Sequence, residues 1–119
     1  MFKTMVVARL QKNNAVISDH VIQADTFGKR LKGLIGYKQL PPNHSILIKP
    51  CKSIHTFFMR FPIDVLFLSD QNDVIAMYKA LQPYRITATV RKACAVLETN
   101  AGVIITHQIS LGDQLRFEI

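Results

Sequence analysis

The 119-residue chain has no tryptophan and only two cysteines, five glycines and five prolines. So few glycines and prolines, without any repeat, exclude a collagen-like or low-complexity chain. Two cysteines without a CxxC pair exclude a disulfide scaffold, so we expect Cys51 and Cys94 to be free thiols, at least one of them buried. The longest apolar run, residues 93–97, is far shorter than the roughly 20 residues that a membrane-spanning helix needs. The sequence therefore predicts no membrane span.

The first ten residues also lack the apolar core of a secretory signal. Only four consecutive apolar residues lie between Lys3 and Arg9, whereas a signal needs about 7 to 15. We therefore expect a cytoplasmic protein. With 49% hydrophobic and 19% charged residues, the chain can bury a core, and its length suits one domain, so we expect a single domain over residues 1–119.

Acidic residues are scarce in the first half of the chain. Residues 1–60 contain ten Lys and Arg against two Asp, while residues 61–119 contain five against six acids, which together give the net charge of +7. Such a basic surface can attract phosphates or other anions, although a solvated basic face is the simpler interpretation. No base-reading or aromatic nucleic-acid motif accompanies the charge. We expect no sequence-specific nucleic-acid binding.

Strand-forming patterns outnumber helical ones. Two β-prone runs, 3–9 and 15–22, flank a polar turn and predict a hairpin, and residues 25–36 have apolar residues at helical spacing after an Asp-Thr cap. Asn100 is expected to cap a second short helix over residues 101–107. Further β-prone segments are 45–49, 63–69, 74–82, 85–90, 93–99 and 114–118. The fold class is therefore α+β, with a mainly antiparallel sheet that could be barrel-like and with two short helices.

The segment 51–68, CKSIHTFFMRFPIDVLFL, concentrates the unusual chemistry of the chain. Cys51 and His55 could be a nucleophile and its base, but their spacing in a loop does not by itself bring them into contact. His44, Cys51 and His55 could ligate a metal, but no second close-spaced ligand pair completes a zinc pattern. Motifs for nucleotides, zinc peptidases and serine hydrolases are absent. We expect no cofactor and no metal site.

Within this segment, IHTFFMRFPIDVLFL resembles the signature of the DUF192 (UPF0127) family. Residues 24–26 and 30–34 resemble the upstream helix motif of the family, although Ile35 stands where a methionine is expected. Agreement continues in order at Pro83, Arg85, Ala93, 96–98, Gly102 and 112–113. The resemblance covers roughly residues 20 to 119. It implies a compact, β-rich α+β domain whose biochemical role is unassigned.

Two functional interpretations follow. In the first, the protein is a non-catalytic binding or accessory module that recognises a small molecule or a partner protein through a surface around His55, Arg60 and Asp64. In the second, the protein is a small enzyme in which His55 carries a proton and the carboxylate of Asp64 or Glu98 orients the His55 side chain. The oligomeric state cannot be derived from the sequence. The candidate ligand-binding residues are His55, Thr56, Arg60, Asp64, Arg85 and Glu98.

Asp64 interrupts an otherwise apolar strand pattern. Along IDVLFL, Ile63, Val65 and Phe67 face one way while Asp64, Leu66 and Leu68 face the other, because strand side chains alternate. A strand that is apolar on both faces is expected to be central, and a carboxylate on it needs partners. We expect Asp64 to be at least half buried and hydrogen-bonded to His55, Arg60, Arg85 or backbone N–H groups.

Overall fold

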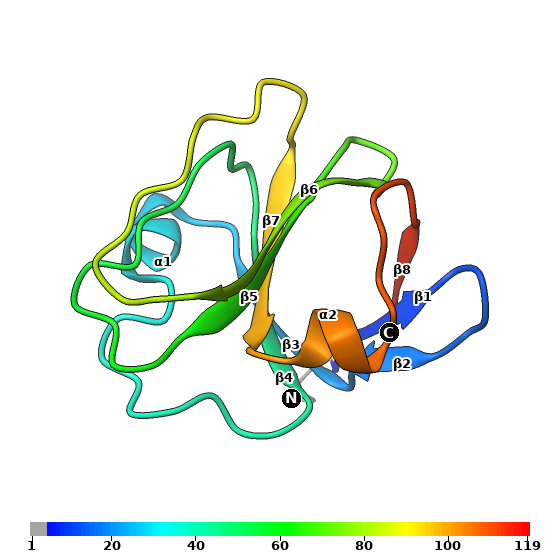
Figure 1. Cartoon of the computed structure of the whole chain (residues 1–119), viewed down its shortest axis with the longest axis horizontal. Helices are drawn as coiled ribbons and strands as arrows, with labels where there is room; N and C mark the ends of the chain where they lie inside the picture. The colour runs from blue at the N-terminus through cyan, green and yellow to red at the C-terminus, as the bar shows by residue number, and fades with distance from the viewer. Residues whose placement is uncertain (1–4) are drawn as a thin grey trace.

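A computed structural model describes residues 5–119 of the chain. They form two sheets with strand orders β2-β1-β8 and β3-β4-β7-β5-β6, and two short helices (Figure 1). The elements are β1 (Val7–Leu10), β2 (Val16–Ser18), β3 (His20–Ala24), α1 (Phe27–Lys32), β4 (His44–Ile48), β5 (Ile63–Leu68), β6 (Val74–Leu81), β7 (Ala95–Asn100), α2 (Val103–Thr106) and β8 (Leu115–Glu118). The α+β class is confirmed. The barrel-like arrangement is not found, because the strands divide between two sheets that do not close.

The expected strand over residues 15–22 is divided between the two sheets. Its first part, β2, forms the predicted antiparallel hairpin with β1, while β3 joins the larger sheet beside β4. Strands β3 and β4 are parallel, with His20 opposite His44, whereas the other strand pairs of the described chain are antiparallel. A parallel pair needs a crossover connection, and α1 lies within it. Figure 1 shows α1 on one side of the larger sheet and α2 with the smaller sheet on the other.

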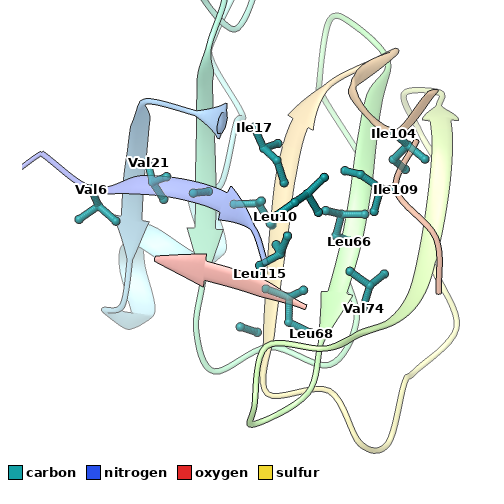
Figure 2. Packing of buried hydrophobic residues seen from close by; sticks show 13 residues of the cluster. Val6, Leu10, Ile17, Val21, Leu66, Leu68, Val74, Ile104, Ile109 and Leu115 are labelled. Carbon is teal, nitrogen blue, oxygen red and sulfur yellow. The ribbon is translucent and has the colours of Figure 1, made fainter. Parts of the chain in front are cut away.

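The central strands β5 and β7 are covered on both faces. Leu66 and Leu68 belong to a cluster with Leu10, Ile104 and residues of the smaller sheet (Figure 2). The alternate residues of β5, among them Val65 and Phe67, belong to a second cluster on the α1 side. The predicted alternation of β5 is therefore confirmed.

Asp64 is 1% exposed, and its carboxylate accepts three backbone hydrogen bonds. Oδ1 accepts from the N–H of Ala80 at 2.8 Å, and Oδ2 accepts from those of Gly102 at 3.1 Å and Ile104 at 2.9 Å. Ala80 has a φ of +49° and lies where the β5–β6 register shifts. The carboxylate thus holds both an irregular part of β6 and the start of α2. Burial and backbone bonding of Asp64 are confirmed.

Other sequence expectations need correction. Asn100 does not cap α2, since the cap residue is Gly102 with a φ of +101°, and the Asp64 carboxylate takes the N–H groups there. Helix α1 ends at Gly33 rather than near Gly36, and the 85–90 segment forms only an isolated bridge between Ile86 and His55. Cys51 and Cys94 are free thiols, but both are partly exposed. Over residues 5–119, no helix has the length and apolar character needed to cross a membrane.

We predict that Asp64→Ala lowers the free energy of unfolding by about 2 to 4 kcal/mol, because it leaves three backbone donors without their acceptor. In Asp64→Asn, the amide oxygen can still accept from the N–H groups of Gly102 and Ile104, but the N–H₂ then faces the Ala80 N–H, so a smaller loss than in Asp64→Ala is expected. Urea unfolding measures both changes. Asp70→Asn, on an exposed turn residue, is the control and should change stability by less than about 0.5 kcal/mol. A loss no larger than that of the control would contradict the anchoring role.

Candidate functional site

A pocket of about 350 Å³ opens between α1, the 50–55 segment and the α1-facing side of the larger sheet. Its apolar wall includes Leu34, Ile48, Ile54 and Met59. Its polar and charged lining residues are Arg30, Lys32, Cys51, Lys52, Ser53, His55 and Glu98. A concave, largely apolar pocket with a few polar groups is typical of a small-molecule site.

Glu98 is the buried acid of this pocket. It lies on β7, opposite Ile46 of β4 and Val65 of β5, and it is 2% exposed. Its Oε1 is buried and has no hydrogen-bond partner within the part of the chain that the structure describes. Gly33 ends α1 directly over this carboxyl, so that a Cβ on Gly33 would lie 3.7 Å from Oε1. A buried polar atom without a partner is rare, because it loses its water without compensation.

Burial raises the pKa of Glu98 to about 8 from a usual value of 4.5, because the charged form loses its hydration. At pH 7 the carboxyl is therefore mostly neutral. A neutral carboxyl can donate one hydrogen bond and accept others. Glu98 thus offers a ligand one hydrogen-bond donor and an acceptor rather than a negative charge.

Two of the lining cations are tethered by backbone carbonyls. Lys52 Nζ donates to the carbonyls of Arg91 at 2.7 Å and Ala93 at 2.8 Å. Arg30 Nη1 donates to the carbonyl of Asp25 at 3.0 Å. Each tether uses only part of the donor capacity of its group, so N–H groups are left for a ligand.

Cys51 and His55 line the pocket but are not joined as nucleophile and base. Burial raises the pKa of the Cys51 thiol, with the Glu98 charge adding to this and the Arg30 charge opposing it. The thiol donates to the carbonyl of Ser53 at 3.1 Å. His55 Nδ1 accepts from the N–H of Phe57 at 3.2 Å. A thiol with a raised pKa is a poor nucleophile at neutral pH.

The structure brings only two of the six candidate binding residues, His55 and Glu98, to this pocket. Thr56 is buried, where its hydroxyl donates to the Gln82 carbonyl at 2.7 Å and accepts from the Arg85 N–H at 2.9 Å. Its bonds therefore join two loops. Arg60 and Arg85 are exposed, and Arg85 Nη1 donates to the carbonyl of Tyr84.

Asp64 is separated from the surface that was expected to contain it together with His55 and Arg60. Strand alternation places it on the sheet face opposite to Glu98, with both oxygens used by backbone donors. Arg30 and Lys52 also line the pocket; the sequence indicated them only as charges of the basic first half and not as candidate site residues, because a charged side chain on a short helix or loop gives no local sign of facing a pocket. Among residues 5–119, no group of three or more His, Cys, Asp or Glu side chains could hold a metal ion.

The DUF192 family model, described as "Uncharacterized ACR, COG1430", matches residues 8–117. The chain belongs to the DUF192 family. A UPF0127 protein of Thermococcus sibiricus is 36% identical over 104 residues, which cover 81% of this chain and 64% of that protein. A UPF0127 protein of Pyrococcus furiosus is 33% identical over 99 residues, which cover 79% of this chain and 83% of that protein. The chain thus spans just under two thirds of the Thermococcus relative.

Solved structures share the fold of this DUF192 chain. A crystal structure from Novosphingobium aromaticivorans, described as a protein of unknown function, has a TM-score of 0.81 at 20% identity, covering 95% of this chain and 84% of that one. A crystal structure from Sinorhizobium meliloti, described as a candidate transcription regulator, has a TM-score of 0.81 at 23% identity, covering 98% and 96%. At these identities the likeness concerns the fold alone. The function of the DUF192 family is unassigned.

We predict that the stability of the wild type falls between pH 5 and pH 8.5 relative to that of Glu98→Gln. The folded state holds the Glu98 proton up to about pH 8, whereas the unfolded chain releases it near pH 4.5. The contribution of this proton to the free energy of unfolding is therefore complete below pH 4.5 and is lost as the pH rises through 8. The relative loss is at most about 5 kcal/mol. Urea unfolding across this pH range measures it, with Asp70→Asn as the surface control. Parallel profiles for wild type and Glu98→Gln would show that Glu98 titrates normally.

Proposed function

We propose that this chain is a binding module that holds a small molecule in the pocket above Glu98. The buried Oε1 of Glu98, without a partner among the described residues, carries the proposal. A neutral carboxyl in an apolar pocket gains a hydrogen bond when a ligand binds. It loses little hydration in return, because folding has already removed water from it.

The position of Glu98 supports a role in binding rather than in folding. Asp64 is equally buried on the neighbouring strand, yet it joins three backbone groups and so contributes to stability. Glu98 makes no comparable bond within residues 5–119, and its burial is unfavourable for folding once it ionises. A residue that costs stability and lines a pocket fits a functional role better than a structural one.

An acid–base enzyme is the alternative, with His55 and Glu98 as its pair. Both side chains line the pocket, but His55 Nδ1 accepts from the Phe57 N–H. A proton carrier needs its orienting carboxylate within hydrogen-bond reach, and no such bond joins these two side chains in the described structure. The binding module is therefore the function that the geometry supports better.

A pocket-filling substitution tests the proposal. Gly33 and Gly36 both have positive φ, but only Gly33 faces Glu98, while a Cβ on Gly36 would meet nothing within 4 Å. We predict that fragments found by ligand-observed NMR on the wild type bind Gly36→Leu normally and bind Gly33→Leu at least about tenfold more weakly, since leucine at 33 occupies the pocket. Circular dichroism checks that both variants fold.

The two thiols give a second measurement on the same samples. Cys51 lines the pocket and Cys94 does not, so a bound fragment should slow alkylation of Cys51 while leaving Cys94 unchanged. Equal binding to the two leucine variants, without protection of Cys51, would place the fragments elsewhere and overturn the proposal.

A further inference from the structure

We propose that the pocket takes a short organic anion, with an uncharged hydrogen-bonding group at its inner end and a carboxylate or phosphate at its outer end. The inner group would meet Glu98, and the outer group would meet Arg30 and Lys52. This inference rests on the proposed function and names the class of ligand that the pocket would hold.

The inner end of the pocket favours an uncharged group. Glu98 offers one donor and its acceptors when protonated, which an amide or a carboxylic acid can match with two hydrogen bonds. An ionised group placed there would lose its own hydration in an apolar pocket without a fixed charge of opposite sign. Leu34 and Ile48 line the pocket, and within residues 5–119 no partner is bonded to Glu98 Oε1 that would offset that loss.

The outer end favours a negative charge. Arg30, Lys32 and Lys52 all line the pocket, and within residues 5–119 Glu98 is its only acidic lining residue. Lys52 is tethered through two carbonyls and Arg30 through one, so part of the entropy of ordering these long side chains is already lost before a ligand binds. A cationic ligand would be repelled by these three side chains.

Glu98 and Arg30 belong to separate elements of the pocket. Glu98 is 2% exposed on β7, whereas Arg30 on α1 is only partly buried and donates to the carbonyl of Asp25. No hydrogen bond joins the two side chains within residues 5–119, since Glu98 Oε1 has no partner there. We therefore expect a ligand that contacts both to have an apolar chain between its two polar ends.

Four six-carbon probes separate these features. Adipamate has both ends, hexanamide has only the inner amide, hexanoate has only the carboxylate, and 6-aminohexanamide has a cation at the outer end. The ¹³C-methyl NMR signal of Met59 reports binding, because Met59 lines the pocket, whereas Met77 lies in the other cluster and is the internal reference. We expect adipamate to bind at least about fivefold more tightly than each of the other three at low salt. Its advantage over hexanamide should fall below about twofold in 0.5 M NaCl.

Matched variants assign the two ends. Arg30→Gln should remove about half or more of the advantage of adipamate over hexanamide, whereas Lys29→Gln, on the same helix but outside the pocket lining, should leave it unchanged. Glu98→Leu should weaken adipamate about tenfold, and Glu98→Gln, which keeps a donor and an acceptor, should stay within about twofold of the wild type.

The outcomes distinguish the two proposals. If no probe shifts the Met59 signal at millimolar concentration, the proposed function fails together with this inference. If the Met59 signal shows that hexanamide or 6-aminohexanamide binds as tightly as adipamate, the pocket binds ligands but the assigned charge at its outer end is wrong. Equal binding of adipamate to Glu98→Leu and to the wild type would overturn the assigned inner end.

Discussion

The need to cover both faces of β5 and β7 determines where the other elements lie. Each of these strands is hydrogen-bonded on both sides within the larger sheet, and the side chains of Ile63–Leu68 are buried throughout. Apolar side chains on two faces require two layers of cover. The smaller sheet and α2 supply one layer, while α1 and the loops that follow it supply the other (Figure 1). The pocket lies within this second layer, where short irregular segments cannot fill all the space that a long helix would fill.

Two buried carboxyls on adjacent strands show how the partners of a group decide its effect. Asp64 and Glu98 differ by one percentage point in exposed fraction, at 1% and 2%, and lie on opposite faces of the sheet. Asp64 accepts hydrogen bonds from three backbone N–H groups, which replace water as its partners. Glu98 has a pKa of about 8, because burial acts on it without such compensation. Burial therefore does not distinguish the anchoring carboxyl of Asp64 from Glu98, the carboxyl that we propose binds a ligand; the hydrogen bonds to their oxygens do.

Local sequence patterns predicted those parts of the fold that local interactions decide. The alternation in 63–68 predicted both faces of β5, and Thr26 caps α1 by accepting from the Lys29 N–H, three residues away. The parallel pairing of β3 with β4 had no local signal, because it depends on how α1 packs. The capping of α2 by Asp64 joins residues 38 and 40 positions apart, a distance over which no local pattern operates. Four of the six expected site residues do not line the pocket, in part for a related reason: in an irregular segment, neighbours in sequence face different directions, so that His55 lines the pocket while Thr56 is buried between two loops.

The walls of the pocket are fixed by bonds that a ligand would not need to break. Ile54 is held by three hydrogen bonds to Thr87: its N–H donates to the Thr87 hydroxyl at 3.0 Å, and its carbonyl accepts from the Thr87 N–H at 3.0 Å and from the Thr87 hydroxyl at 3.3 Å. Lys52 is fixed from the same side by the carbonyls of Arg91 and Ala93. On the opposite wall, Gly33 closes α1 through its own N–H to the Lys29 carbonyl. Because these hydrogen bonds fix the lining residues before a ligand arrives, binding would order few additional groups. Most of the interaction energy of a ligand with Glu98 and the cations would then contribute to its affinity.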